Sequence, residues 1–390
     1  MGDLFGKRSC RRAVNEPRTE ESAKTSKKVA NEYLTYDVLR IIFRYLNGQE
    51  LSSASMVCRF WLEAANDEKR TRGPVCLLET CDDPTNNEEA CSIGHMKVRL
   101  IKKSPIKPAL GLFFTNMSVP FSELECHCKA LPRNCDIVSV TTRGTVINNI
   151  EYEESVDKNV YVCAFLPELP DVKISTFTIG YSLLPKTYMP KSIRKRIHEI
   201  ITALNPSGTI GNRSKCLLLL SNLKGREIAE RTLYTLKHCY RRDPFPIWGG
   251  VAEELVLCSS RYTKSDHSED STACVAFTLT GAIDTWSVIL TVYYSTKERV
   301  EKRLKLFKDS VRLKKHSIGL MFACCARGKD MFREDNVESS IFKKLFPEVP
   351  LVGCIGYGEF GRNTLSNEGP SITEKLFNQM STVFLIITYG

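Results

Sequence analysis

Two turns near the C-terminus carry the side chains best suited to binding a small charged molecule. Residues 318–328 are predicted to form a strand and a turn presenting Cys324 and Arg327, and residues 350–361 a strand and a Gly-rich turn with one acid, Glu359. Arg327 and Glu359 could receive the two charges of a zwitterion such as an amino acid, because glycines let a ligand approach the backbone. The alternative, which we favour, is a structural Arg–Glu pair at the rim of a sheet. The candidate site comprises Cys324, Arg327, Gly328, Gly356, Gly358, Glu359, Gly249 and Gly250.

Cys324 raises a separate possibility. A thiol on a turn beside Arg327 could have a lowered pKa and capture electrophiles or respond to redox conditions. The alternative is an inert, buried cysteine that packs as a small hydrophobe. No nucleotide-binding loop, HExxH or GxSxG motif occurs, and no histidine carries a local signature of a catalytic base. We therefore predict no catalytic residues.

Two cysteine groups raise the question of zinc. The first is Cys76-x4-Cys81-x9-Cys91-x3-His95, and the second is Cys126-His127-Cys128 with Cys135. Structural zinc sites usually use a tight Cys-x2-4-Cys pair and a closing pair on a second knuckle. Neither group fits that pattern well, and the acidic run between Cys81 and Cys91 predicts a loop. We predict no metal and no cofactor.

The elements that must position these residues alternate between strands and helices from about residue 106 onward. This pattern predicts an α/β or α+β domain. The order strand, helix, Pro-strand-Gly, strand-Gly occurs at residues 217–281 and again at residues 318–390, so we infer two related halves, with chance similarity of βαβ units as the alternative. The predicted strands are Leu110–Phe114, Ile137–Thr141, Val160–Phe165, Val172–Ile179, Leu217–Leu220, Thr272–Leu279, Trp286–Tyr293, Ile318–Ala323, Leu351–Cys354 and Val383–Thr388, and the predicted helices are Ser192–Leu204, Arg226–Cys239, Lys297–Leu313 and Val337–Leu345.

A different pattern occupies residues 31–72. Apolar residues recur at spacings of three and four from Val38 to Leu46, which predicts a short helix that Thr35 caps and that ends at Asn47-Gly48. A second apolar set runs from Leu51 to Trp61. Three such short helices bury too little surface to be stable alone, so something must dock against them.

This segment resembles an F-box. The resemblance rests on Leu34-Thr-Tyr-Asp-Val-Leu-Arg-Ile-Ile-Phe-Arg-Tyr-Leu46 and on Val57-Cys-Arg-Phe-Trp61, with Thr35 in place of the usual proline. The alternative is a helical hairpin packed on its own protein. The resemblance implies that a Skp-family adaptor binds Leu34, Ile42, Leu46, Leu51, Val57, Cys58 and Trp61.

The region from about Leu110 to the end is similar to the FIST domain, a module of bacterial signalling proteins and F-box proteins. The motifs at residues 318–328 and 350–361 carry the resemblance to its C-terminal half, and Trp248-Gly-Gly250 resembles its N-terminal half. Ala326 stands where the family tends to have glycine, and the cysteines at residues 76–91 are not expected from it.

The expected organisation is a multi-domain chain: a small all-α F-box module followed by a large α/β (α+β) FIST-type domain of two related halves. We place a disordered basic tail at 1–30, the F-box at 31–72, a linker with perhaps one strand at 73–105, and the two halves at 106–281 and 282–390. A charge of +10, from 55 basic and 45 acidic residues, includes this tail, where no aromatic residues interleave, so we predict no nucleic-acid partner. No apolar run is long enough to span a membrane.

Together the resemblances imply a non-catalytic substrate receptor of a cullin-RING ubiquitin ligase, resident in cytoplasm and nucleus. Its partners would be the adaptor, the cullin and RING subunit through the adaptor, and protein substrates. One alternative is a module that senses a small-molecule ligand and carries a vestigial F-box. The other is a cysteine-dependent enzyme.

Overall fold

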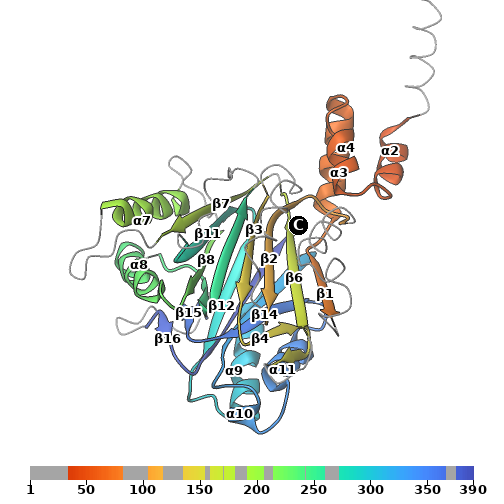
Figure 1. Cartoon of the computed structure of the whole chain (residues 1–390). Helices are drawn as coiled ribbons and strands as arrows, with labels where there is room; N and C mark the ends of the chain where they lie inside the picture. The colour runs from red at the N-terminus through yellow and green to blue at the C-terminus, as the bar shows by residue number, and fades with distance from the viewer. Residues whose placement is uncertain are drawn as a thin grey trace, which may run out of the picture.

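A helical module near the N-terminus leads into a large domain built of three β-sheets with helices on their outer faces (Figure 1). This architecture confirms the predicted multi-domain fold, a small all-α unit followed by a large α/β region. The computed structural model describes residues 34–81, 104–116, 135–153, 159–169, 171–180, 191–205, 214–241, 243–259, 272–365 and 375–390. The predicted basic tail, Cys91, His95 and the segment Cys126–Cys128 lie outside the described residues.

Three short helices form the N-terminal module: α2 (Tyr36–Phe43), α3 (Gly48–Ala54) and α4 (Arg59–Thr71). Thr35 caps α2, since its side chain accepts a hydrogen bond from the Val38 amide. The prediction that Asn47-Gly48 ends this helix is wrong. Asn47 instead begins α3 through a capping box with Glu50, in which each side chain binds the other residue's amide.

The first sheet combines parallel and antiparallel pairs. Strands β2 and β3 are parallel, β6 is antiparallel to β2, and β1 is antiparallel to β6. The antiparallel β10 extends the sheet beyond β3. In spatial order the strands are β1 (Val75–Cys81), β6 (Asn159–Pro167), β2 (Pro108–Thr115), β3 (Asp136–Thr141) and β10 (Glu254–Ser259).

The other two sheets repeat this plan. In the second sheet β8 and β9 are parallel, and β11 and β7 follow β8 in antiparallel order. In the third sheet β13 and β14 are parallel, and β17 and β12 follow β13 in the same way. In spatial order the strands of the second sheet are β7 (Val172–Ile179), β11 (Cys274–Gly281), β8 (Ser214–Asn222), β9 (Ile247–Ala252), β15 (Glu359–Gly361) and β16 (Phe377–Asn378). Those of the third sheet are β12 (Asp284–Leu290), β17 (Thr382–Tyr389), β13 (His316–Cys324), β14 (Leu351–Gly356), β4 (Gly144–Ile147) and β5 (Ile150–Tyr152).

The domain therefore contains three related units, which we call unit 1 (75–167), unit 2 (172–281) and unit 3 (284–389). Each unit lends one strand to another unit's sheet: β4 of unit 1 pairs with β14, β10 of unit 2 with β3, and β15 of unit 3 with β9. The exchange is cyclic and closed. The element order that recurs in the sequence at residues 217–281 and 318–390 lies in units 2 and 3. The predicted N-terminal half, 106–281, contains unit 2 and also most of unit 1, whose first strand β1 lies in the segment predicted to be a linker.

Helices occupy equivalent places in units 2 and 3. Between the first and second strands lie α7 (Lys191–Leu204) and α9 (Lys297–Ser310). Between the two parallel strands lie α8 (Arg226–Cys239) and α11 (Val337–Leu345), the latter preceded by the short α10 (Lys329–Phe332). Their apolar faces pack on the sheets, which yields separate hydrophobic clusters over the second and third sheets.

The largest apolar cluster joins all three units. Trp248 of unit 2 is fully buried between Phe114 of unit 1 and Phe322 of unit 3, with ring centroids 6.4 Å and 6.0 Å away. Edge-to-face contacts of this kind stabilise beyond the area they bury. Unit 1 is therefore part of the same core as the units predicted from sequence.

Candidate functional site: the F-box helices and the C-terminal turns

The N-terminal module buries one apolar face and exposes another. Leu39, Phe43 and Leu51 form its core together with small residues of α3 and α4. Apolar side chains on the other face are exposed, and the extreme cases are Tyr45 at 85%, Met56 at 79% and Val57 at 61% of their accessible surface. The full exposed set is Val38, Ile41, Ile42, Tyr45, Met56, Val57, Phe60 and Leu62. Soluble proteins rarely expose so many large apolar side chains in one short segment unless a partner covers them.

The predicted adaptor-binding residues divide between these two faces. Ile42, Val57 and Cys58 are exposed. Leu34, Leu46 and Trp61 are half-buried and pack against the module's own core. Trp61 makes an edge-to-face contact with Phe43, with ring centroids 5.4 Å apart. Leu51 is buried, so it supports the exposed surface from beneath and cannot touch a partner directly.

The predicted adaptor-binding set omitted six exposed apolar residues: Val38, Ile41, Tyr45, Met56, Phe60 and Leu62. Helical periodicity identifies an apolar stripe but not which face of the helix the protein itself covers. In α2 the apolar residues occupy more than one stripe, since Leu39 and Phe43 are buried while Ile41 is exposed. That excess of apolar positions over one stripe was the available signal.

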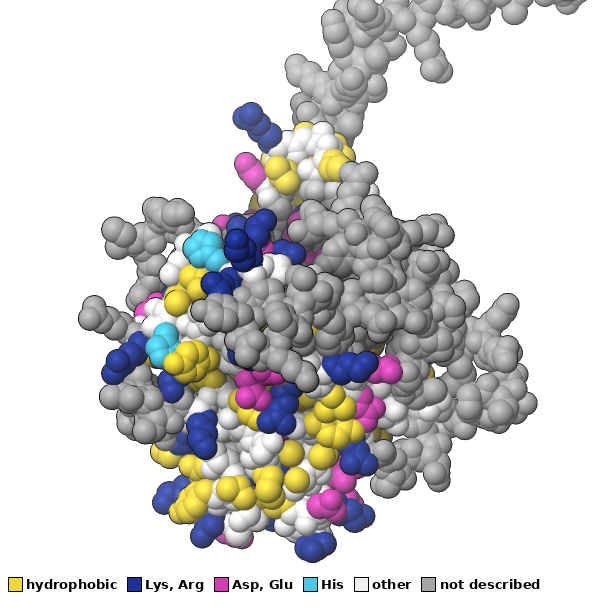
Figure 2. All heavy atoms as spheres, turned by 60° about the vertical axis from the view of Figure 1, so that its left-hand side comes forward, with side chains coloured by type: hydrophobic (Ala, Val, Ile, Leu, Met, Phe, Trp, Pro, Cys, Tyr) yellow, Lys and Arg dark blue, Asp and Glu magenta, His cyan; other side chains and the backbone are white. Residues whose placement is uncertain are grey.

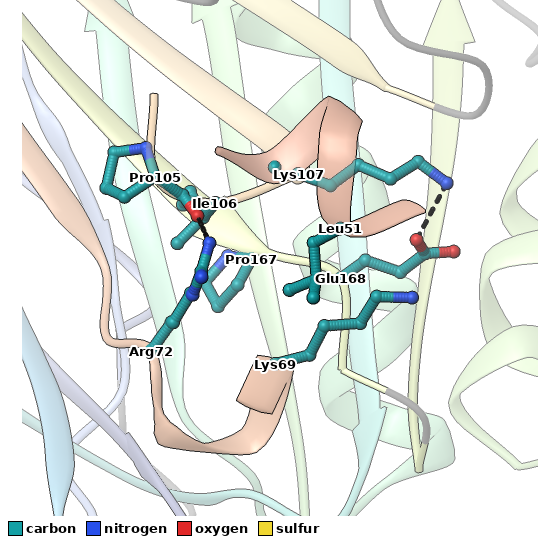
Figure 3. Close-up of a pocket in the computed structure, with 9 residues that line it drawn as sticks. Leu51, Lys69, Arg72, Pro105, Ile106, Lys107, Pro167 and Glu168 are labelled. Carbon is teal, nitrogen blue, oxygen red and sulfur yellow. Dashed lines mark hydrogen bonds and ion pairs between the residues drawn. The ribbon is translucent and has the colours of Figure 1, made fainter. Parts of the chain in front are cut away.

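The module is fixed to the sheet domain along a narrow seam (Figure 3). Arg72, at the end of α4, donates hydrogen bonds to the carbonyl oxygens of Phe43 and Pro105 and pairs with Glu68 at 3.0 Å. A side chain at Gly48 would lie 2.3 Å from the Ile106 backbone, so the seam requires glycine there. About 10 Å³ remains free between the two surfaces, room for one water at most. The seam is a structural joint.

Arg327 lies just before α10, which is at the end of the large domain away from the F-box helices (Figure 1), and its side chain is completely buried. Its Nε and Nη2 donate to both oxygens of Glu338, the shortest contact being 2.5 Å. Its remaining N–H groups donate to the carbonyl oxygens of Thr291, Met380 and Tyr294, at 3.2, 3.1 and 2.8 Å. Every N–H of the guanidinium is therefore hydrogen-bonded within the protein.

The structural alternative predicted for Arg327 is therefore present, but with Glu338 as the partner in place of Glu359. Glu338 is on α11 and also accepts a hydrogen bond from Thr382 at 2.6 Å. A bidentate, fully hydrogen-bonded ion pair satisfies two charges away from water. The sequence held no local signal for this pairing, because the two residues meet only through the turn and short helix between β13 and α11.

Glu359 is also fully buried, so a ligand or partner at the surface does not reach it. Its Oε2 accepts hydrogen bonds from the amide and hydroxyl of Ser381, at 3.1 and 2.6 Å. Burial raises the pKa of this carboxyl, while the bonds from Ser381 and the neighbouring Cys324 thiol oppose the shift. Burial and the nearby Glu359 raise the pKa of Cys324. This is the opposite of the lowered thiol pKa considered from the sequence.

Four glycines of the predicted site, Gly249, Gly250, Gly356 and Gly358, come together, but protein atoms fill the space between them. A side chain at Gly250 would lie 2.4 Å from the Phe322 ring, and one at Gly356 would lie 2.7 Å from it. Gly249 and Gly358 have positive φ angles, at which added side chains would meet the Leu219 carbonyl and the Phe377 ring. Gly328 (φ 62°) is closed by the Glu153 carboxylate. These glycines permit close packing of the units.

A polar cluster not predicted from sequence lies where the units exchange strands. Arg143, Glu253 and Tyr357 occupy equivalent positions, each between the second parallel strand and the exchanged strand of its unit. The Tyr357 hydroxyl donates to Glu253, while Arg143 opposes the upward shift that burial imposes on the Tyr357 pKa. The sequence feature that could have located this cluster is the threefold repeat, of which sequence analysis detected only two copies.

Metal ligands do not gather within the described part of the chain. Of the cysteines considered for zinc there, Cys76 and Cys81 lie on β1 and Cys135 is buried beside β3. Burial raises the pKa of both Cys76 and Cys135. Among the described helices, none is long and apolar enough to cross a bilayer.

Comparison with known proteins agrees with both parts of this geometry. Residues 36–71, which are α2 to α4, match the F-box-like family, and residues 276–362 match the FIST C domain. F-box only protein 22 of Homo sapiens is 23% identical over 392 residues, covering 91% of this chain and 93% of the human protein. The Pongo abelii protein of the same name is 22% identical over 388 residues with the same coverage.

A solved cyanuric acid hydrolase from A. caulinodans covers 81% of this chain and 99% of its own, at 9% identity and a TM-score of 0.32, too low to carry an argument about fold. The chain therefore combines an F-box-like domain with a FIST C domain and is similar over most of its length to F-box only protein 22.

Proposed function

We propose that this protein is the substrate-recognition subunit of an SCF-type E3 ubiquitin ligase. The F-box surface binds a Skp-family adaptor, which brings the cullin and RING subunit. The three-unit domain holds a protein substrate for ubiquitination and proteasomal degradation. Residence in the cytoplasm and nucleus is part of this proposal.

The exposed apolar face of α2 and of the α3–α4 turn is the observation that carries the proposal. Tyr45, Met56 and Val57 together place bulky side chains in water, which is unfavourable by about 25 cal/mol for each Å² left uncovered. An adaptor that offers apolar helices removes that surface from water.

The receptor contributes position and no chemical step of its own. Binding adaptor and substrate on one chain makes their encounter effectively intramolecular. That gain requires a stable orientation between the two binding surfaces, and the seam at Gly48 and Arg72 supplies it. Ubiquitin transfer itself belongs to the partner subunits.

The ligand-sensing alternative draws less support from the same contacts. Its proposed anchor, Arg327, already donates every N–H to protein acceptors. Binding a zwitterion there would require breaking a buried ion pair.

Co-purification with the adaptor and cullin tests the proposal. The informative variant is Met56→Asp/Val57→Asp, because both side chains are exposed and their loss should leave the helical core intact. The control is Leu306→Asp/Leu313→Asp, two leucines outside the module that are 45% and 46% exposed. Wild type and control should retain both partners, and the F-box variant should lose them. A wild-type protein that retains neither partner would refute the receptor function.

A further inference from the structure

Two turns at the end of the large domain away from the F-box helices carry exposed apolar side chains. One turn joins β12 to α9 and the other joins β16 to β17, and both contact Arg327 just before α10 (Figure 1). Val292 and Tyr293 in the first turn are 55% and 63% exposed, and Met380 in the second is 42% exposed. Figure 2 shows hydrophobic side chains interspersed with Lys and Arg at this end of the molecule. Core packing does not account for side chains that the fold leaves so exposed.

The backbone conformation of both turns favours residues of other types. The Tyr294 amide donates to the Thr291 carbonyl at 2.9 Å, so Val292 and Tyr293 are the two central residues of a β-turn, where Asn, Asp, Gly and Pro are preferred. Met380 has a φ of 53°, in the left-handed region that glycine and asparagine adopt at less cost. Neither turn formation nor burial therefore explains these three bulky residues. Backbone strain that the surrounding structure maintains is characteristic of functional sites.

Buried polar groups hold both turns in place. The Arg327 guanidinium donates to the carbonyl oxygens of Thr291 and Met380, at 3.2 and 3.1 Å, and so ties the two turns together. Ser381, the residue after Met380, donates its amide to the buried Glu359 carboxylate at 3.1 Å. Because the backbone beside the exposed side chains is already fixed, little ordering of this backbone opposes the binding of a partner.

A cation lies beside the first turn. The Arg299 guanidinium is 4.6 Å from the centre of the Tyr293 ring and donates to the Tyr293 carbonyl at 3.1 Å. In the part of the chain that the structure describes, no acid pairs with Arg299. A guanidinium stacked on an aromatic ring can still bind a carboxylate through its free N–H groups. Since Tyr, Met and Arg are enriched at protein–protein interfaces, the composition suits a protein partner that brings an apolar surface and a carboxylate.

We propose that Val292, Tyr293, Met380 and Arg299 form the surface on which a protein substrate docks. The substrate covers the three apolar side chains with an apolar surface of its own and places a carboxylate against Arg299. This surface and the F-box helices lie at different ends of the chain, so adaptor and substrate bind without competing. The inference rests on the proposed receptor function and names the place and the class of substrate surface that this receptor takes.

The test uses the full-length protein bound to its adaptor and a displayed library of random peptides. Peptides selected on the wild type and depleted on Tyr293→Asn/Met380→Asn should be enriched in apolar residues beside Asp or Glu. In fluorescence anisotropy, a synthetic peptide of the selected sequence should bind this double variant about tenfold or more weakly than wild type. Arg299→Glu should weaken binding and abolish the preference for acidic peptides, because the peptide carboxylate then meets a like charge.

The stability of the same double variant separates a binding role from a structural one. Asparagine suits both turn conformations, so the urea midpoint of Tyr293→Asn/Met380→Asn should equal or exceed that of wild type. Side chains that serve only the fold would lower the midpoint when replaced. The matched controls are Leu313→Asn and Arg312→Glu, at exposed positions beyond the end of α9, and both should bind the peptide as wild type does.

Three results would overturn the assignment. They are a lowered urea midpoint in the double variant, a library that yields no peptide preferring wild type over it, and equal peptide binding by wild type and Arg299→Glu. A wild-type dimer that dissociates in the double variant, measured by analytical ultracentrifugation, would assign the surface to a second copy of the chain instead. Retention of the adaptor by every variant separates these failures from a failure of the receptor function, in which wild type itself would bring down no adaptor.

Discussion

The F-box helices and the turn at Arg327 both carry residues that the sequence offered as candidates for binding, and they differ in how far the fold covers and hydrogen-bonds those residues. In the F-box, Tyr45, Met56 and Val57 are bulky apolar groups exposed to water. At the C-terminal turn, Arg327 and Glu338 are buried, paired and saturated with hydrogen bonds. Residue types alone made both regions candidate binding sites, although a structural ion pair was the favoured interpretation at Arg327. Binding capacity follows from what the fold leaves uncovered, so we assign the proposed interaction to the first region, whereas the second holds unit 3 together.

The largest expected effect comes from breaking the saturated region. Arg327→Met leaves the Glu338 carboxylate buried without its partner and removes the donors of three carbonyls. We expect the free energy of unfolding to fall by about 3–5 kcal/mol, measured by urea denaturation. Arg312→Met, at an exposed position, is the control and should change it by less than about 0.5 kcal/mol. A small effect at Arg327 would mean that the network is not structural.

A smaller loss is expected from the F-box core. Leu51→Ala removes a buried side chain that packs with Leu39 and Phe43. We expect a loss of about 2–3 kcal/mol, concentrated in the helical module. Hydrogen exchange should therefore accelerate in residues 36–71 and remain unchanged in β13 and β17. Uniform acceleration throughout the chain would show that the module does not open separately.

Glu151 lies close to the Arg327–Glu338 pair, and its raised pKa predicts that the stability of the fold depends on pH. Burial and then repulsion from Glu338 raise the pKa of Glu151 from 4.5 to about 7, against the hydrogen bond from Ser339. The folded state therefore holds this proton more tightly than the unfolded state, and stability decreases as pH rises from about 4.5 to 7.

One proton bound in this way changes the free energy of unfolding by at most about 1.4 kcal/mol per pH unit. Glu151→Gln should remove this part of the pH dependence in urea titrations between pH 4.5 and 7.5. Glu348→Gln, at an exposed position, is the control. An unchanged slope in the Glu151 variant would contradict the assignment.

The smallest effect on stability is expected at the exposed F-box surface. Val57→Ser changes a side chain that is 61% exposed, so the free energy of unfolding should shift by no more than about 0.5 kcal/mol. Adaptor affinity, measured by calorimetric titration, should nevertheless decrease. A variant that binds the adaptor normally would move the interaction surface away from the α3–α4 turn.

Much of the secondary structure followed from local pattern. Four helices and ten strands of the large domain were predicted near their observed places, and the bounds of β7, α8 and α11 were predicted to the residue. Strands β4, β5 and β10 were missed. β4 and β5 hold only four and three residues, and β4 and β10 are defined by pairing with strands of another unit, which no local window contains.

The candidate sites, too, were predicted where a local pattern defines them and mispredicted where long-range packing does. The F-box was visible from Leu34 to Trp61 because its apolar positions lie within one short segment. The predicted glycine cleft was not visible in that way: Gly250 and Gly356 do approach each other, but the Phe322 ring occupies the space between them. Spacing along the chain indicates which residues can meet, and packing decides what fills the space.

By itself, the sequence determined the two-part organisation, the element types and the repeated unit in residues 217–390, because periodicity and turn residues are local properties. Tertiary structure decided the third unit, the cyclic exchange of strands, the Arg327–Glu338 pair and the face of the F-box left in water. Each of these depends on contacts between residues distant in the chain, and their energies come from burial and from the satisfaction of buried polar groups, which exist only once the chain has folded.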